Sequence, residues 1–406
     1  MASCKTLTHP RPGGLSIVFL RDAILGHQSW VESDLQDLLL LSRRGNRVRV
    51  IFGRAPNARK PSSYVTPGFT FDDIVLAGGN SALSKARYIL VAFFRVARMA
   101  GSVDCIIMTP HLVPFLLPAV LVRRVTTHSP VLLLRMSTNP VETGGLISTI
   151  VMKFLYQLSV RLANVFFDKT LFISPMLRDY YCALSHVPRQ KAGLWPTSVD
   201  LHLFDPNVSS RRVRLLKERL GVGDRVCLMY HGSLSRSRGI MELLEAMRLL
   251  KQEKRRDVVL ILLGLGPLRE EIRRYIQSEG LQDMVIFPEP VERNELVEHI
   301  ALSDVEVLPI PDHEWWRYQN FVKVLECLAM NKPLIAFPLP AVRAIVGDMP
   351  VVYWLRGTEG SDIAEGILGY LRTRDSLRPS LGRSIASRYS VDAAAENLLV
   401  DITERN

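Results

Sequence analysis

The chain has 406 residues, of which 48% are hydrophobic and 22% charged, a composition that excludes a disordered protein. A chain of this length is expected to form two domains of roughly 200 residues each. The net charge of +11 is unevenly distributed, because residues 1–195 hold 23 Lys and Arg against 10 Asp and Glu, whereas residues 196–406 hold 28 against 30.

The first elements along the chain predict the start of a doubly wound sheet. An apolar strand over 15–21 is followed by a loop, a helix over about 30–43, Gly45 and a second strand over 48–52. A strand, a helix, a glycine and a strand in this order form the opening unit of a doubly wound α/β domain.

A long amphipathic segment follows in the basic half. Further strands are expected over 103–108 and 131–134, and residues 146–167 have the periodicity of a helix. We interpret its apolar face as packed in the core, because most amphipathic helices are buried on that side, and membrane contact is the alternative. The face consists of Ile147, Val151, Phe154, Leu158, Leu162 and Val165.

A segment rich in proline and turn-forming residues, GLWPTSVDLHLFDP over 193–206, is the expected interdomain linker. It separates an N-terminal domain over 1–195 from a C-terminal domain over 196–385, and a final helical segment occupies 386–406.

The C-terminal domain begins with a strand, a polar loop and an amphipathic helix over 226–250. A loop of this kind places backbone amides and cations near phosphates. Arg238 is its candidate phosphate-binding cation, with a merely solvated arginine as the alternative. The glycine-containing loops after the first two strands of this domain hold Gly232, Ser233, Gly264 and Gly266.

The segment NFVKVLECLAMNKPLIAFPLP, over 320–340, combines a helix start, a cation and a carboxylate. Asn320 is the expected N-cap, because its side chain can accept hydrogen bonds from the first-turn amides. Those amides, the helix dipole and Lys323 suit a diphosphate, and Glu326 offers acceptor oxygens to sugar hydroxyls. The pattern indicates a nucleotide-sugar site, and a solvated Lys323–Glu326 pair on a helix is the alternative.

At these residues the chain resembles the retaining glycosyltransferases of family 4, which have the GT-B fold. One branch of that family has the pattern Pro-x-Lys-x-x-Glu-(Tyr)-x-Ala-x-(Gly)-Lys-Pro here. The resemblance covers most of the chain and is strongest over 193–340. The chain matches the pattern at Lys323, Glu326, Ala329, Lys332 and Pro333 and departs from it at Phe321, Cys327 and Asn331.

The resemblance implies an α/β fold of the GT-B type, with two doubly wound Rossmann-like domains facing a cleft. The N-terminal domain would bind the acceptor, the C-terminal domain would bind the nucleotide sugar, and the helix over 386–406 would return to the first domain. Glu326 is implied to bind the donor ribose, and Arg238, Asn320 and Lys323 the diphosphate. The implied donor loops contain Gly232, Ser233, Gly264, Gly266 and Phe321.

Acidic contacts to the sugar or the acceptor are less defined. Glu32 matches a family position near the expected cleft, but an acid favoured by the helix dipole is an equal alternative. Tyr318 stands where many members have a second glutamate, and Glu314 is the nearest upstream acid. The N-terminal stretch that corresponds to a sugar-contacting histidine has Arg135 and Ser137 instead, so we assign no catalytic residue.

The implied activity is the metal-independent transfer of a sugar, with retention, from a nucleoside-diphosphate sugar to a glycan or lipid-linked acceptor. No cofactor or metal is expected, because there is no Asp-x-Asp pair and the five scattered cysteines include no Cys-x-x-Cys pair. One alternative is a non-catalytic GT-B member of a glycan-assembly complex. A nucleotide-sugar epimerase is the other, although the N-terminal half has few acids for proton transfer.

The basic half also suggests a partner surface. It lacks a recognisable nucleic-acid-binding motif, and its cations alternate with apolar helices, which favours an anionic membrane surface or a lipid-diphosphate acceptor over nucleic acid. The apolar run over 15–20 is too short for a signal peptide, and no run reaches the roughly 18 residues of a spanning helix. We therefore expect a cytoplasmic protein with peripheral association at the inner face of the membrane.

Overall fold

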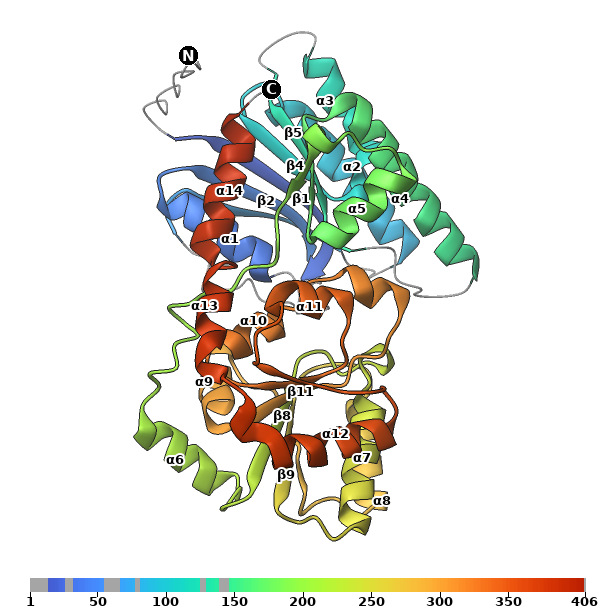
Figure 1. Ribbon diagram of the computed structural model, residues 1–406. Coiled ribbons are helices and arrows are strands. Elements are labelled where there is room, and N and C mark those ends of the chain that lie inside the picture. The colour runs from blue at the N-terminus through green and yellow to red at the C-terminus, as the bar shows by residue number, and fades with distance from the viewer. Residues whose placement is uncertain are drawn as a thin grey trace. The chain divides into compact units, whose positions relative to one another are not determined.

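The structure is a computed structural model that describes residues 14–25, 32–54, 66–76, 81–124, 129–138 and 146–404. The chain divides into two compact units (Figure 1). Unit 1 comprises Met1–Pro196 and Asp392–Asn406, and unit 2 comprises Thr197–Val391.

The described part of unit 1 contains a seven-stranded parallel sheet in the order β3-β2-β1-β4-β5-β6-β7. The order reverses between β1 and β4, which is the doubly wound topology, and ligands of such sheets bind outside the carboxyl ends of the strands at that point. The strands are β1 (Ser16–Leu25), β2 (Arg47–Arg54), β3 (Phe69–Val75), β4 (Cys105–Met108), β5 (Val131–Met136), β6 (Lys169–Phe172) and β7 (Ala192–Leu194).

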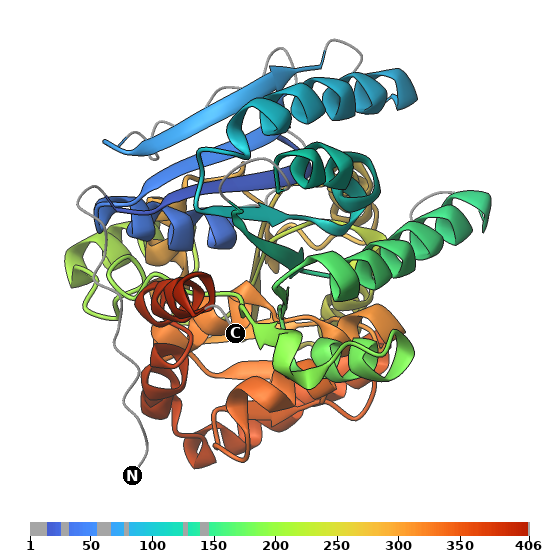
Figure 2. The same ribbon diagram turned by 90° about the horizontal axis from the view of Figure 1, so that it is seen from above.

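Helices cover both faces of this sheet. One face carries α1 (Glu32–Arg43) and the C-terminal helix α14 (Val391–Thr403) (Figures 1 and 2). Leu398 of α14 joins the same buried cluster as Trp195, and Lys169 Nζ lies 2.8 Å from Asp401 Oδ1, so α14 belongs to unit 1. The other face carries α2 (Ala82–Met99), η3 (Pro110–Leu112), α3 (Val113–Arg124), α4 (Leu146–Phe166), α5 (Pro175–Leu184) and η4 (Arg189–Lys191).

Unit 2 repeats this architecture with a six-stranded parallel sheet in the order β10-β9-β8-β11-β12-β13. Every residue of β9 is buried, as expected for a parallel strand covered on both faces. The strands are β8 (Val226–His231), β9 (Val258–Leu263), β10 (Val285–Ile286), β11 (Val305–Leu308), β12 (Leu334–Ala336) and β13 (Val352–Trp354). Two parallel α/β units confirm the expected fold class of two Rossmann-like domains.

The helices of unit 2 also lie on both sides of its sheet. The main core forms where α7 and α12 pack together and bury Leu243, Met247, Ile363 and Ile367. The helices are α6 (Ser210–Arg219), η5 (Arg236–Arg238), α7 (Ile240–Gln252), α8 (Arg269–Ser278), α9 (Arg293–Leu302), η6 (Glu314–Tyr318), α10 (Val322–Ala329), α11 (Pro340–Val346), α12 (Gly360–Thr373), η7 (Arg374–Ser376), η8 (Pro379–Leu381) and α13 (Gly382–Ser387).

The interpretation of the apolar face of α4 as a core face is wrong. Val151, Phe154 and Val165 are exposed, and the side chain of Ile147 lies outside those that the structure describes. The buried side is formed instead by Tyr156, Ser159, Val160 and Ala163. Ser159 and Ala163 are small enough to allow close approach on this side, and the hydroxyl of Ser159 lies within hydrogen-bond distance of the carbonyl oxygens of Pro110 and Leu155.

None of the described helices combines the length and the apolar character that a membrane-spanning segment requires.

Candidate functional site

In unit 2 the strand order reverses between β8 and β11, which pair directly. His231 ends β8, Glu306 lies within β11, and Glu326 lies on α10, which follows β11 along the chain. All three are buried, so the switch point of the sheet contains titratable groups shielded from water.

Both carboxylate oxygens of Glu326 are occupied. Oε2 lies 2.9 Å from His231 Nε2, and Oε1 accepts a 2.9 Å hydrogen bond from the guanidinium of Arg293, the first residue of α9. On the other side of the imidazole, His231 Nδ1 lies 3.0 Å from Glu306 Oε1. The backbone amide of His231 donates to the same oxygen at 3.1 Å. These four side chains therefore form a row of alternating charges, which is buried except at Arg293, whose side chain is partly exposed.

The row favours the ionised forms of His231 and Glu326. Burial by itself would lower the pKa of His231, but the carboxylates of Glu306 and Glu326 raise it to about 9. Burial would raise the pKa of Glu326, but Arg293, His231 and Lys323 hold it below its ordinary value. At neutral pH the site therefore has an imidazolium at His231 beside the carboxylate of Glu326.

Lys323, in the first turn of α10, is 6% exposed, and its ammonium lies 3.8 Å from the centroid of the Tyr230 ring. Among the described residues its Nζ has no hydrogen-bond partner. Burial, followed by the charge of Arg238, lowers the pKa of Lys323 to about 7. A buried, unpartnered ammonium at a helix start is a position for an anion.

The loop after β8 leaves room for that ammonium. Gly232 has φ +129°, and a Cβ at this position would lie 2.8 Å from Lys323 Nζ. Ser233 accepts a 2.8 Å hydrogen bond from the hydroxyl of Tyr230 through its carbonyl oxygen. The second glycine loop packs against the first, because a Cβ at Gly264 would clash with the carbonyl oxygen of Gly232, and one at Gly266 would clash with the backbone of Leu234.

A second cation lies close to Lys323. Arg238 ends η5, and its guanidinium lies over the ring of Trp316, 4.1 Å from the centroid. Burial lowers the pKa of Arg238. The indole of Trp316 donates a 2.8 Å hydrogen bond to the carbonyl oxygen of Ser237, which fixes the ring under the arginine. Arg236 in the same loop is exposed and is bound by both carboxylate oxygens of Glu271, at 2.8 Å each.

The predicted N-cap of α10 is wrong by one residue. The cap is Phe321, which makes no side-chain cap hydrogen bond, and Asn320 precedes it. Phe321 is buried, and its ring centroid lies 5.9 Å from that of Trp316. Packing of this ring therefore sets the helix start, and the polar side chain of Asn320 falls outside it.

The remaining candidate residues are exposed, belong to unit 1, or have side chains outside those that the structure describes. Glu32 begins α1, but its side chain is not among those described. Glu314 is exposed at the start of η6. In unit 1, Ser137 is half-buried and Arg135 is fully buried. The guanidinium of Arg135 lies 2.8 Å from a carboxylate oxygen of Asp34, whose other oxygen lies 2.6 Å from Arg21.

No motif in the sequence pointed to His231, Arg293 or Glu306. The available signal was Glu306, an acid within the otherwise apolar run VEVLPIP, because a charge in a buried strand requires a partner. His231 directly before a loop glycine was a weaker signal. Neither pattern identifies the partner, which comes from a different strand or helix.

Three side chains in the described part of the chain bring possible metal ligands together. His231, Glu306 and Cys327 place one ligand atom each within 4.8 Å of one another. A metal would require a neutral imidazole and a thiolate, yet the two carboxylates raise the pKa of His231 and burial raises that of Cys327. The ion pairs of the row account for this geometry, and we assign it no metal.

Residues 225–372 match the family model described as Glycosyl transferases group 1. The alpha-D-kanosaminyltransferase of Streptomyces kanamyceticus is 26% identical over 232 residues, which are 56% of this chain and 58% of that protein. The match to this model and the names of such relatives support an enzyme of the transferase class.

A second relative acts on a lipid, according to its name. The GDP-mannose-dependent alpha-(1-6)-phosphatidylinositol monomannoside mannosyltransferase of Mycolicibacterium smegmatis is 28% identical over 142 residues, 35% of this chain and 36% of its own length. The match thus spans 58% of the length of the first of these curated relatives and 36% of the length of the second.

Solved structures match nearly the whole chain. HepE of Anabaena, in complex with UDP and glucose, has a TM-score of 0.72 at 16% identity and covers 95% of this chain and 98% of its own. WaaG, a glycosyltransferase involved in lipopolysaccharide biosynthesis, has a TM-score of 0.71 at 14% identity and covers 95% and 99%. At these identities the similarity shows the fold alone, and that fold is GT-B.

Proposed function

We propose that the protein is a retaining glycosyltransferase of family 4 that moves a sugar from a nucleoside-diphosphate sugar to a glycan or lipid-linked acceptor without a metal ion. The observation that carries this proposal is the buried, unpartnered ammonium of Lys323 at the start of α10, with Arg238 nearby. Two cations and a helix start match the charge of a diphosphate leaving group. UDP in the solved HepE complexes supports the same class of donor.

The chemistry follows from where charge develops. When the bond between the sugar and the diphosphate breaks, negative charge grows on the leaving phosphate oxygens. Cations held in place before the reaction stabilise that charge without reorganising. Lys323 and Arg238 would supply this stabilisation, and a bound diphosphate would in turn favour the protonated form of Lys323, whose pKa is about 7 without it.

Glu326 would hold the donor ribose. His231 and Arg293 keep its carboxylate ionised and fix its orientation, and each carboxylate oxygen has a second lone pair for a sugar hydroxyl. The two ion pairs therefore hold in place the carboxylate oxygens of Glu326, which would accept hydrogen bonds from the ribose hydroxyls. Asn320, Phe321, Ser233 and the loop glycines Gly232, Gly264 and Gly266 would line the donor, with Glu32 and Glu314 as candidate sugar or acceptor contacts.

Unit 1 would bind the acceptor, because its seven-stranded sheet has the doubly wound order and its residues carry the positive charge that an anionic, lipid-linked acceptor requires. A cytoplasmic location with peripheral membrane association belongs to the same proposal.

A non-catalytic member of a glycan-assembly complex is the second candidate. Tyr318 stands where many family members have a glutamate, and Arg135, in the stretch that corresponds to a sugar-contacting histidine, is bound to Asp34. This candidate predicts donor affinity without turnover on any acceptor. An isomerised sugar nucleotide as the only product would instead identify an epimerase.

The first experiment is a thermal-shift panel of UDP-, GDP- and ADP-sugars on the wild type, Glu326→Ala, Arg238→Gln and Arg236→Gln. One nucleotide class should stabilise the wild type. That shift should be lost in Glu326→Ala and weakened about tenfold or more in affinity in Arg238→Gln, because a charge-assisted contact is removed. Arg236→Gln is the matched control, since its partner is Glu271, and it should behave as wild type.

No shift with any sugar nucleotide would remove the main support for the transferase. An equal loss in both arginine variants would contradict the assignment of Arg238, because then the whole loop, and not the residue beside Lys323, would determine binding.

A further inference from the structure

Three consecutive helices of unit 1 contain no acidic residue. They are α2, α3 and α4, which lie next to one another on one face of the sheet (Figures 1 and 2). Their sequences carry eight cations, which are Lys85, Arg87, Arg95, Arg98, Arg123, Arg124, Lys153 and Arg161. Such a one-sided charge is expected where a surface meets an anionic partner.

The outward side of α2 mixes cations with large apolar side chains. Leu83, Leu90 and Phe94 are 82%, 59% and 54% exposed, and Arg87 and Arg98 are exposed with them. These positions recur every three or four residues, so they lie along one side of the helix. The opposite side of α2 is buried and supplies Tyr88, Ala92 and Val96 to the core.

The outward side of α4 has the same composition. Phe154 is 62% exposed, Ile150 and Val165 are exposed, and Lys153 and Arg161 are exposed among them. Phe115 of α3, between the two helices, is exposed as well. We call this surface the α2–α4 face; it consists of Leu83, Lys85, Arg87, Leu90, Phe94, Arg98, Phe115, Ile150, Lys153, Phe154, Arg161 and Val165.

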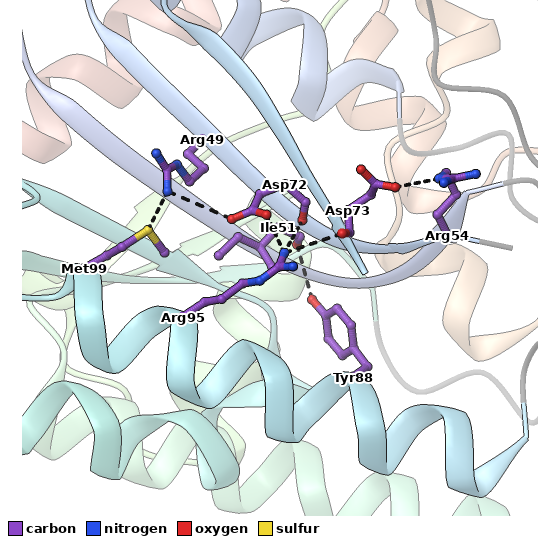
Figure 3. A network of polar contacts seen from close by, with 8 residues as sticks. All are labelled: Arg49, Ile51, Arg54, Asp72, Asp73, Tyr88, Arg95 and Met99. Atoms are coloured by element: carbon purple, nitrogen blue, oxygen red, sulfur yellow. Dashed lines mark hydrogen bonds and ion pairs between the residues drawn. The ribbon is translucent and has the colours of Figure 1, made fainter. Parts of the chain in front are cut away.

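Asp72 and Asp73, which lie beside α2, form ion pairs with Arg95 and Arg54 (Figure 3). Asp72 of β3 is bound by Arg95, which also donates to the Asp72 carbonyl oxygen at 3.2 Å. Asp73 accepts a 2.6 Å hydrogen bond from Arg54 of β2. The cations of the α2–α4 face differ, because no described acid forms an ion pair with Lys85, Arg87, Arg98, Lys153 or Arg161.

We propose that the α2–α4 face docks onto the surface of an anionic lipid bilayer. Isolated leucine, isoleucine, valine and phenylalanine side chains between cations suit the boundary between lipid headgroups and acyl chains. The apolar groups enter that boundary, and the cations pair with the anionic headgroups. Nucleic acid would leave the exposed aliphatic side chains without apolar contacts. A protein partner would have to supply acids to pair with five or more cations.

Attachment through the α2–α4 face would specify how unit 1 makes the peripheral membrane association of the proposed function, and it requires nothing of the donor site in unit 2. It gives the N-terminal unit a second property, attachment to a lipid surface, which a lipid-linked acceptor would exploit if the proposed transferase function holds.

The test is co-sedimentation of the full chain with phosphatidylcholine vesicles that contain either none or about a third of phosphatidylglycerol. The wild type should bind the anionic vesicles and weaken as salt rises, because screening shortens the range of the attraction. It should bind the neutral vesicles much less. Arg87→Glu/Leu90→Glu and, on the other helix, Phe154→Glu should each weaken binding to anionic vesicles about tenfold or more.

The matched control is Arg211→Glu/Leu215→Glu on α6 of unit 2, where Leu215 is 54% exposed and Arg211 is also exposed. It makes the same change in net charge and removes a similar apolar side chain, so its vesicle binding should stay within about twofold of wild type. Equal losses in the control, equal binding to neutral vesicles, or no binding at low salt would each overturn the proposal. The melting temperature of each variant shows whether it is folded, and its donor-induced thermal shift shows whether the donor site of unit 2 is intact. Failure of the membrane proposal is therefore distinguishable from failure of the proposed function.

Discussion

Lys323 shows how a single residue can trade stability for binding. Its ammonium is buried without a hydrogen-bond partner in the described structure, which costs free energy until an anion arrives. The row of His231, Glu306, Glu326 and Arg293 differs, because each charge there faces an opposite one. The site thus holds a row of paired charges beside one cation without a partner among the described residues, and we propose that this cation binds the donor diphosphate.

We expect donor affinity to fall as pH rises above 7. Burial lowers the pKa of Lys323 to about 7 in the free protein, so at higher pH the donor must bind together with a proton. The dissociation constant for UDP should therefore increase by up to about tenfold per pH unit between pH 7 and 9. Calorimetry in buffers of different ionisation enthalpy should detect the proton uptake.

Lys323→Arg and Lys323→Met provide the controls for that titration. The arginine variant keeps its charge throughout this range, so its affinity should not depend on pH, and the methionine variant should bind weakly at every pH. The methionine variant should also be more stable than wild type at pH 6, by ~1–3 kcal/mol, because folding no longer buries an ammonium there. That gain should shrink as pH rises from 7 toward 10, since the lowered pKa makes the wild type more stable with rising pH. A pH-independent wild type would contradict this account.

Among the elements, the loops after β8 and β9 depend on close backbone contact. Gly232 combines a left-handed backbone conformation with the ammonium of Lys323 at the place of a Cβ, and Gly264 faces the carbonyl oxygen of Gly232. A side chain at either position would move the loop away from α10. The loops after β8 and β9 therefore help to position Lys323 and Arg238, in addition to the helices that carry these two residues.

Gly232→Ala should weaken donor binding about tenfold or more and destabilise the protein by ~1–3 kcal/mol, because it adds backbone strain and displaces Lys323. Gly221→Ala is the matched control, since Gly221 has φ +63° but nothing within 4 Å of a new Cβ. The control should cost about 1 kcal/mol of unfolding free energy and leave donor binding unchanged. Denaturant unfolding and donor titration of both variants would check this, and equal effects on binding would show that strain alone is responsible.

At the scale of the molecule, two parallel sheets with the same strand order form two units, and the C-terminal helix α14 completes the first of them. Leu398, Ala395 and Ile402 of α14 are buried in the cluster that contains Trp195. Unit 1 is therefore assembled from the two ends of the chain, with all of unit 2 inserted between them. Its stability should depend on a helix that is remote in sequence.

Leu398→Ala should destabilise unit 1 by ~2–4 kcal/mol through the cavity that it leaves, and should not alter donor-induced stabilisation of unit 2. Val400→Ala, on the same helix, is the control, because Val400 is exposed, and it should change stability by less than about 0.5 kcal/mol. Calorimetry with and without the donor separates the two units. A donor response lost in Leu398→Ala would show that the units do not unfold separately.

Patterns that act over a few residues were predictable from the sequence. Alternating apolar strands and helices indicated two doubly wound domains, and Lys323 and Glu326 share a helix because their spacing is local. Helix periodicity also placed Val151, Phe154 and Val165 together on one side of α4. It did not determine whether that side faces the core or the solvent, because helix periodicity shows which residues share a side but not what packs against that side.

The tertiary structure decided the rest, since it depends on residues far apart in the chain. His231 meets Glu326 of α10 across 95 positions. Glu306 reaches the backbone of His231 across 75 positions, because β8 pairs with β11. The start of α10 shifted from Asn320 to Phe321 because the phenylalanine ring packs against Trp316. The sequence by itself determined the two sheets and the helix that carries the cation and the carboxylate. Only the fold determined which charges have a partner and which apolar face is left in solvent, because the partners and the covering residues come from segments that are distant in the sequence.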